Sequence, residues 1–404
     1  MGKSAISAAV CAESSPIASS REPDRCCDLL ELFAGVSDGR SGQGRDHPVA
    51  VVLALAAAAV AAGMRGYTAI SGWVADVPPP VLAGLYMRAG AVPGPPPSKT
   101  TIWRVLTDAS AGELDAAAGA WLVNLAGLSV PDAAGQDGSP EALTQVRLDG
   151  KAIRGAKDAG GKQVRLLAAM VGPDAATSVI AAQAEVGKKT NEVPVATAVL
   201  GRVDLNGKVV TAGALHTVKA TANYIRQHGG EFILPVKENR RALFDAVNAL
   251  PWEQAPIAHA ATGKGHGRIT TRTIQVLPAP EGLPFPHVSQ VFLIERYVTG
   301  LHGQPVSAVA ALGVASPEAG QADAAAIAGY VREQWSIESL HWLRDTLYQE
   351  DRSQVRTRSG PRVMAALRNL AICAIRLFGR ADVTEATRWA SRGMDRPFTI
   401  LGLT

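Results

Sequence analysis

Two acidic residues of this chain have neighbours that are typical of a metal-dependent site. Asp149 lies in a short strand-like run, residues 146–151, and Glu338 lies in a helical segment between Trp335 and Trp342. Positions i, i+3 and i+7 share one face of a helix, so Glu338 is expected between two indole rings. Clustered carboxylates are what two-metal phosphoryl transfer requires, because they hold magnesium ions and align the attacking and leaving oxygens.

Both carboxylates also have ordinary explanations. A single Asp at the end of a strand commonly forms the turn of a solvated hairpin. A carboxylate in an apolar stripe is costly unless something neutralises it, and for Glu338 that partner could be Arg332 or His341 instead of a metal ion. The residue types and spacing leave these alternatives open.

A second strand-like run, residues 208–213, ends in Gly213. Parallel strands that end at one edge of a sheet present their last residues together, so a metal site at this edge would need a carboxylate here. Glycine has no ligand atom. Of the nearby acids, Asp204 lies at the opposite end of the strand and Asp345 would need a different helix orientation, whereas Glu192 remains a candidate substitute.

The order of the expected elements predicts the fold class. Residues 28–130 are helical in pattern and are broken by proline clusters. Beyond a Gly/Pro-rich linker, three strand-like runs predict an antiparallel meander, and two helix–strand units follow. This order predicts an α/β fold with a ribonuclease-H-like mixed sheet, in which the first, fourth and fifth strands are parallel. The five strands are expected at residues 146–153, 164–171, 178–186, 208–212 and 231–236.

Composition shifts divide the chain into seven segments. They are a disordered N-terminal tail (1–27), a helical N-terminal domain that is a candidate for DNA binding (28–130), a linker (131–145), the first part of the ribonuclease-H-like core (146–250), a β-rich insertion (251–320), the C-terminal helices of the core with Glu338 (321–380), and a C-terminal tail (381–404).

The overall composition excludes several classes of protein. Of the 404 residues 47% are hydrophobic and 19% are charged, which is typical of a globular chain. The balance of 40 Lys+Arg against 36 Asp+Glu permits a polyanionic partner without requiring one. The four cysteines lack the spacing of a disulfide framework or a zinc site. Because the apolar stretch 49–62 is shorter than the roughly 20 residues that span a bilayer, we expect a cytoplasmic protein without membrane contact.

Seven sequence segments occur in a fixed order along the chain. They are LDGKAIRGA at 148–156, KKTNEVP at 188–194, VVTAGALHT at 209–217, FILPVKEN at 232–239, GHGR at 265–268, WSIESLHWLRD at 335–345 and EDRSQVRT at 350–357. In these segments and their spacing, the chain from about residue 28 to residue 404 resembles the DDE-type insertion-sequence transposases of the H-repeat-associated family.

The resemblance implies a chemistry and a set of partners. It implies a ribonuclease-H-like core with a β insertion and Mg²⁺-dependent (or Mn²⁺-dependent) cutting and joining of DNA ends. Asp149 matches the first catalytic aspartate and Glu338 the catalytic glutamate, and both would be metal ligands. The family has its second aspartate between TA and ALHT, where this chain has Gly213. The implied partners are double-stranded DNA, the terminal inverted repeats of the element and a second copy of the chain, with the protein at the nucleoid when it binds DNA.

Gly213 leads to two functional hypotheses. The chain is either a DNA transposase whose activity is impaired by the missing carboxylate, or a non-catalytic DNA-binding protein derived from a transposase, such as a regulator or a competitor of active copies. Glycine at this position takes a ligand from one metal and leaves that metal's positive charge uncompensated. The two hypotheses differ in whether DNA binding is accompanied by cleavage.

Several cations are candidates for DNA contact. A short helix that begins after Ser98 could present Lys99 and Arg104 as a recognition helix does, although an ordinary amphipathic helix has the same pattern. The other candidates lie beside the carboxylates, on the β-rich insertion and after the Glu338 helix, and they are Lys151, Arg154, Lys237, His266, Arg268, Arg356 and Arg358.

Overall fold

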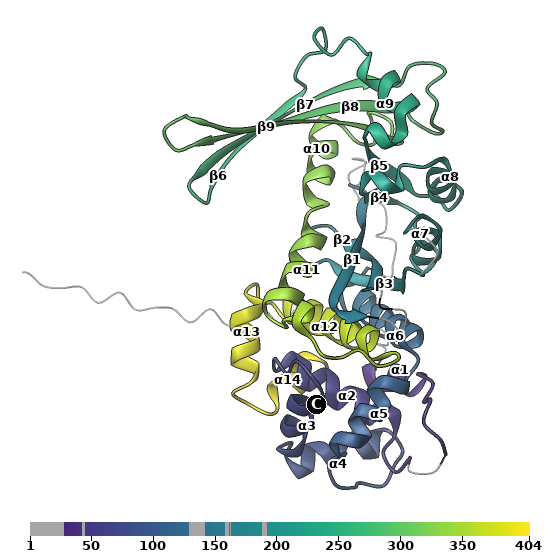
Figure 1. Cartoon of the computed structure of the whole chain (residues 1–404), viewed down its shortest axis with the longest axis vertical. Coiled ribbons are helices and arrows are strands. Elements are labelled where there is room, and N and C mark those ends of the chain that lie inside the picture. Colours follow the sequence, from purple (N-terminus) through teal and green to yellow (C-terminus); the bar gives the residue numbers. More distant parts are fainter. Residues whose placement is uncertain (1–27, 43–44, 129–141, 158–160, 162, 188–191) are drawn as a thin grey trace, which may run out of the picture.

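The computed structural model of the chain is elongated, with a helical body at one end and a sheet that continues into a projecting arm at the other (Figure 1). It describes residues 28–42, 45–128, 142–157, 161, 163–187 and 192–404. The expected N-terminal tail and most of the expected linker lie outside these residues. Within them, no helix is both long and apolar enough to cross a bilayer.

The N-terminal helices surround one alanine-rich helix. The helices are α1 (Leu29–Ala34), α2 (Val49–Ala61), α3 (Tyr67–Ala75), α4 (Pro79–Arg88), α5 (Lys99–Asp108) and α6 (Ala111–Leu125). Every residue of α2 after Val49 is buried. A helix that is apolar on all sides is stable only when other elements cover it completely, which explains why α2 lies at the centre of this group.

The sheet has the strand order that the sequence predicts. The strands β1 (Thr144–Lys157), β2 (Gln163–Gly172) and β3 (Val179–Glu185) form an antiparallel meander, and β1 pairs in parallel with β4 (Lys208–Ala212), which pairs in parallel with β5 (Glu231–Val236). The resulting order β3-β2-β1-β4-β5 confirms the expected mixed sheet. Three helices cover one face of it through a common core, namely α7 (Glu192–Leu200), α8 (Lys219–Gln227) and α9 (Arg241–Asn248).

The β-rich insertion extends this sheet. Its strands are β6 (His259–Gly265), β7 (Arg268–Pro278), β8 (Gln290–Gly300) and β9 (Pro305–Ala315), and β9 pairs antiparallel with β5, so one sheet of nine strands results. The last four residues of β9 are buried and its first seven are exposed. The outer parts of the four strands, residues 259–274 and 294–311, therefore project from the body, and we call them the β-arm (Figure 1).

The C-terminal helices connect the sheet to the N-terminal helices. They are α10 (Ala324–Glu333), α11 (Ser336–Thr346), α12 (Gly360–Leu377), α13 (Val383–Ala390) and α14 (Arg396–Ile400). The expectation of a C-terminal tail at 381–404 is wrong, because α13 and α14 lie in this segment and bury Phe398 and Leu401 completely. One hydrophobic core contains Leu53 of α2, Leu106 of α5 and Leu367 of α12, so the helices of both ends fold together.

Candidate functional site

Asp149 and Gly213 lie side by side where the parallel pairing of β1 and β4 stops. The last residues in parallel register are Leu148 of β1 and Ala212 of β4. The next residue is Asp149 on β1 and Gly213 after β4. We call this place the Asp149 edge. The sequence predicts a strand that ends at Ile153, but β1 continues to Lys157 because β2 pairs with it as far as that residue. Asp149 is thus held within a strand and does not form a turn.

The side chain of Asp149 faces the helices α10 and α11. Successive strand residues alternate between the two faces of a sheet, so Asp149 shares a face with Gln145, Arg147 and Lys151. All three contact that helical pair: Gln145 Nε2 donates to the Tyr330 carbonyl at 2.8 Å, Arg147 Nε to the Glu333 carbonyl at 2.9 Å, and Lys151 Nζ to Asp345 Oδ2 at 2.6 Å. Asp149 Oδ2 itself lies 3.3 Å from Nδ1 of His341 on α11.

Glu338 lies in the first turn of α11, close enough to Asp149 for their charges to interact. Burial raises the pKa of Glu338, and the negative charge of Asp149 raises it further. The expectation of a buried apolar stripe around Glu338 is wrong, since Trp335 and Trp342 are 61% and 62% exposed. His341 is one of the two partners that the sequence allows for Glu338, but it contacts Asp149 instead.

Gln334 fixes the junction of α10 and α11 against both strands of the Asp149 edge. Its Nε2 donates to the carbonyl of Leu148 at 3.1 Å, and its Oε1 accepts from the hydroxyl of Thr211 on β4. Thr211 also accepts from Gln145 on β1 at 2.7 Å. Sequence reasoning does not identify Gln334, although it lies one turn before Glu338. Its two bonds set where α11 begins relative to Asp149.

The space beside Gly213 is open. A Cβ atom built on Gly213 meets no atom within 4 Å, and the backbone there is extended (φ −68°, ψ 160°). Because Thr211 faces α10 and α11, the alternation of side chains points position 213 toward the same face as Asp149. A side chain at this position would therefore share a face with Asp149, and its Cβ atom would displace no neighbour.

The other nearby acids have partners of their own. A Cβ atom on Gly150 would collide with the carboxylate of Glu192, so Glu192 lies on the face of β1 opposite to Asp149. Glu192 Oε2 also lies 3.4 Å from Nε2 of the buried His216. Asp345 does face the Asp149 side, but it forms an ion pair with Lys151. Neither acid lies beside Gly213 as a free carboxylate.

The donor atoms at the Asp149 edge suit a divalent cation in type but not in number. Carboxylate oxygens are the ligands that Mg²⁺ prefers, and two like charges that interact are stabilised by a cation between them. Among the residues that the structure describes, no three His, Cys, Asp or Glu side chains are grouped so that they could hold a metal ion. Asp149 and Glu338 are two carboxylates whose charges interact, and position 213 adds no third ligand.

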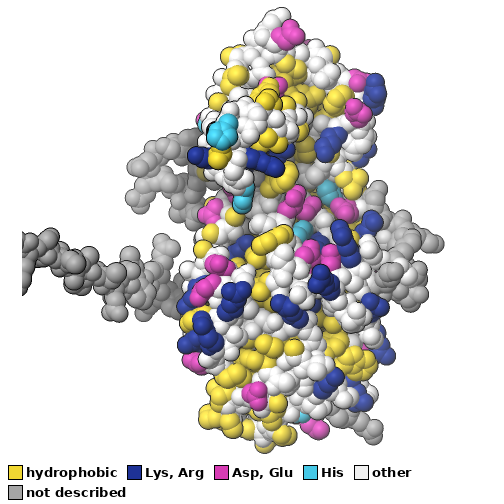
Figure 2. Space-filling model, turned by 60° about the vertical axis from the view of Figure 1, so that its left-hand side comes forward, with side chains coloured by type: hydrophobic (Ala, Val, Ile, Leu, Met, Phe, Trp, Pro, Cys, Tyr) yellow, Lys and Arg dark blue, Asp and Glu magenta, His cyan; other side chains and the backbone are white. Residues whose placement is uncertain are grey.

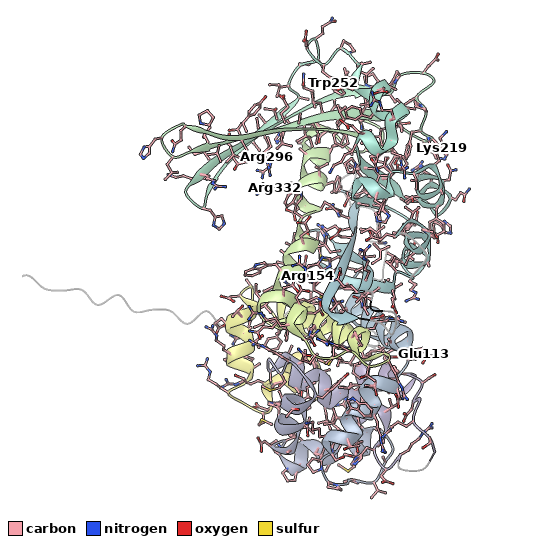
Figure 3. All side chains as sticks on the ribbon, in the orientation of Figure 1. Glu113, Arg154, Lys219, Trp252, Arg296 and Arg332 are labelled. Atoms are coloured by element: carbon pink, nitrogen blue, oxygen red, sulfur yellow. The ribbon has the colours of Figure 1, made fainter. Side chains whose placement is uncertain are left out.

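The expected DNA-contacting residues near the carboxylates fall into two environments. Lys151 is buried by its ion pair with Asp345, which keeps its ammonium group from the surface. Arg154 and Arg356 are exposed at the far end of β1, where Arg154 lies 3.4 Å from Asp351 and Arg356 Nε donates to the carbonyl of Gly155 at 2.9 Å (Arg154 is labelled in Figure 3). These two arginines are brought together by the structure.

The N-terminal candidates lie next to the segment that follows α11. Ser98 caps α5 as expected, accepting from the amide of Thr101 at 3.2 Å. Lys99 lines a cavity of about 600 Å³ together with Arg65, Trp103 and Arg352. Two more candidates are exposed. They are Arg104 on α5 and Arg358, whose Nη1 lies 2.5 Å from Asp108 Oδ1.

The remaining candidates are exposed and separate. Lys237 directly follows β5. His266 lies in the turn between β6 and β7, at the tip of the β-arm, and Arg268 begins β7. Positive φ angles at His266 (50°) and Gly267 (71°) are those of a tight two-residue hairpin turn. Figure 2 shows acidic side chains gathered at mid-height of its visible face, with Lys and Arg side chains around them.

Comparisons with known proteins identify two matched regions. Residues 143–374 match a family described as "Transposase DDE domain", and residues 30–122 match one described as "DDE_Tnp_1-associated". The chain is 36% identical over 141 residues to the "Uncharacterized protein in dhlA 3'region" of Xanthobacter autotrophicus, which covers 34% of this chain and 47% of that protein. It is 24% identical over 247 residues to the "H repeat-associated putative transposase YhhI" of Escherichia coli (strain K12), which covers 56% and 62%.

These matches span less than two thirds of either relative. Among solved structures, the chain is similar to the piggyBac transposase in a synaptic complex with hairpin DNA, with a TM-score of 0.42 and 8% identity over 93% of this chain and 76% of that one.

Proposed function

Because this chain belongs to the family of DDE transposases, we propose that it is the DNA transposase of an insertion sequence, with a cutting site built on Asp149 and Glu338 that is impaired by Gly213. The observation that supports the proposal is that Asp149, Gly213 and Glu338 lie close together in the fold. Asp149 and Gly213 follow the last parallel pair of β1 and β4, and the charge of Asp149 acts on Glu338.

In this proposal Asp149 and Glu338 hold Mg²⁺ or Mn²⁺, which when bound offsets the charge of the scissile phosphate and orients the reacting oxygens. His341 keeps the carboxylate of Asp149 turned toward α11 through their 3.3 Å contact. Gln334 is a positioning residue, since its bonds to Leu148 and Thr211 set the start of the helix that carries Glu338.

The proposed impairment follows from the chemistry of Gly213. A hydrogen atom in place of a carboxylate removes a metal ligand and one negative charge, and the nearby acids Glu192 and Asp345 are engaged elsewhere. A cation at this site would bind more weakly and would be placed less accurately against the phosphate.

The proposed partner is double-stranded DNA that carries the terminal inverted repeats of the element, bound by two copies of the chain. Phosphate contacts are proposed for exposed cationic side chains of β1, of α5, of the β-arm and of the segments that follow β5 and α11. Exposed Lys and Arg side chains neutralise backbone phosphates. These residues are Lys99, Arg104, Arg154, Lys237, His266, Arg268, Arg356 and Arg358. Lys151 joins them only if its ion pair with Asp345 opens.

Cleavage of labelled terminal-repeat DNA in the presence of Mg²⁺ tests the proposal. The natural chain is compared with Gly213→Asp, and with Gly213→Asp combined with Asp149→Ala as the control that removes the opposite ligand. We expect weak or no cleavage by the natural chain, clear cleavage by Gly213→Asp, and none by the combined variant. Full activity of the natural chain would show that position 213 does not limit the reaction.

Gly213 also supports a second function, that of a DNA-binding protein without catalysis. A regulator or a competitor of active copies needs the DNA surface but no metal ligands. It predicts salt-sensitive DNA binding that survives both Asp149→Ala and Glu338→Ala, with no cleavage by Gly213→Asp. The absence of DNA binding at low salt would exclude it.

A further inference from the structure

Three arginines converge in the angle between the β-arm and α10. Arg272 on β7 and Arg296 on β8 are direct partners in the antiparallel register, so their side chains leave the sheet on the same face. Arg332 lies near the end of α10, and Figure 3 shows Arg296 and Arg332 on the inner side of this angle. We call the three residues the arm arginines.

The arm arginines begin where the apolar contact between the sheet and α10 ends. One register step closer to the body, the same face of the sheet carries Ile274 and Ile294, which pack in one core with Ile327 of α10. One register step from the arginines toward the tip of the β-arm, the same face carries Thr270 and Val298. Along this face of the sheet, the isoleucine pair is followed by the arginine pair. The surface next to the apolar contact with α10 is therefore cationic.

No acidic side chain among the described residues neutralises the arm arginines. Within the described ranges none of the three guanidinium groups has a salt bridge, and Nε of Arg296 is buried without a hydrogen-bond acceptor. Burial lowers the pKa of Arg272, and the charges of Arg332 and Arg296 lower it further. A buried N–H without an acceptor costs free energy, and so does the repulsion of like charges, so an anion here would relieve both.

We infer that the arm arginines are a clamp for the phosphate backbone of DNA that passes between the β-arm and the Asp149 edge. Arg332 precedes Glu338 by less than two helical turns along α10 and α11, so a strand held here continues toward the carboxylates. Guanidinium forks match phosphate oxygens in geometry, and three from separate elements hold a phosphate in one orientation. This inference rests on the proposed function. The arm arginines lie outside the seven sequence segments that carry the family resemblance.

Salt dependence of DNA binding tests the clamp. Each phosphate contact adds about 0.9 to the slope of log K against log salt concentration for duplex DNA. The variants are Arg272→Gln with Arg296→Gln, and separately Arg332→Gln. The matched control is Lys219→Gln on α8, an exposed cation on the opposite side of the molecule (Figure 3). Melting temperatures confirm that each variant is folded, and Arg296→Lys keeps the charge without the fork.

We expect the slope to fall by about 0.9 for each phosphate that an arginine variant no longer neutralises, with weaker binding at a given salt concentration and no change for Lys219→Gln. Natural and arginine-variant chains that bind DNA with equal slopes would overturn the clamp and leave the proposed function standing. The clamp would also be overturned if inorganic phosphate raised the melting temperature of the natural chain but not of the variants, while the salt slope of DNA binding stayed unchanged. The arginines would then form a site for a free anion. A natural chain that binds no DNA would overturn both.

Discussion

The carboxylate of Asp149 lies 3.3 Å from Nδ1 of His341, one turn beyond Glu338 on the same helix. This contact ties the ligand on the strand to the helix that carries the other ligand. Burial lowers the pKa of His341 below its usual value, and its hydrogen bond to Asp149 opposes this shift only in part. His341, which is not a proposed ligand, thereby connects Asp149 to the helix that carries Glu338.

Gly213→Asp is expected to make the stability of the protein depend on Mg²⁺. The added carboxylate enters open space on the face of Asp149, where three acids repel one another without a cation. We expect a lower melting temperature than the natural chain in EDTA and a larger rise with millimolar Mg²⁺, because ligand binding stabilises by mass action.

Gly213→Asn is the matched control for this experiment, since it has the same shape without the charge. It should show neither the loss in EDTA nor the gain with Mg²⁺. Equal metal responses of the natural chain and Gly213→Asp would contradict the placement of position 213 at the metal.

Lys151→Ala is expected to lower the free energy of unfolding by about 1–3 kcal/mol, because it leaves Asp345 without its partner. Urea denaturation of Lys151→Ala, Asp345→Ala and the double variant measures the coupling. We expect the double variant to lose clearly less than the sum of the single losses. Strict additivity would mean that the 2.6 Å contact has no energetic role and that Lys151 is free for DNA.

Glu350→Gln is expected to destabilise the fold by about 3–5 kcal/mol, since it leaves two buried arginines without a counter-charge. Glu350 is fully buried and accepts from Arg344 Nε at 2.9 Å and from an Arg368 nitrogen at 2.7 Å. This network fastens the end of α11 to α12, and so supports the helix of Glu338.

The same carboxylate makes stability depend on pH. Although burial opposes it, the two arginines lower the pKa of Glu350 from 4.5 to about 2. A lowered pKa stabilises the folded state above the unfolded value, so this contribution, about 3 kcal/mol, is present above pH 4.5 and is lost as the pH falls toward 2. Urea midpoints between about pH 6 and 3 should therefore fall more steeply for the natural chain than for Glu350→Gln.

Trp335→Ala and Trp342→Ala are each expected to weaken binding of DNA with unpaired ends, and to leave stability nearly unchanged. Both indoles are more than half exposed beside Glu338, and a base that stacks on an aromatic ring contributes about 1–3 kcal/mol. Binding is followed by fluorescence anisotropy of the labelled DNA. Trp335→Phe keeps an aromatic face and should retain most of the affinity; a Phe variant as weak as the Ala variant would argue against stacking.

Much of the fold could be predicted from the sequence because its signals are local. The strands at 208–212 and 231–236 are expected with the bounds that the structure has, since each is a short apolar run between turn residues. The fold class and the family are confirmed by the sheet order and by the match over residues 143–374. The tail expected at 381–404 is helical because its apolar residues pack on distant helices, which no local pattern reveals.

The candidate site could be predicted only in part. Residue type and the family resemblance make Asp149 and Glu338 candidates, but the contacts of His341 and Gln334 depend on how α11 meets β1. The sequence does not reveal the arm arginines as a group, although Arg268 and Arg272 lie four residues apart and so share one face of a strand. That spacing is the one available signal, whereas the contribution of Arg332 comes from another element.

The shared core of the two helical regions sets the order of events during synthesis. The cover of α2 is complete only when α12 and α14 are present, and those elements are made after the whole sheet. At about 5–20 residues per second, the ribosome needs roughly 10–50 s to travel from α6 to α12. Throughout that interval α2 is covered only in part, by α1, α3 and α5, so the nascent chain exposes an apolar surface until α12 and α14 are made.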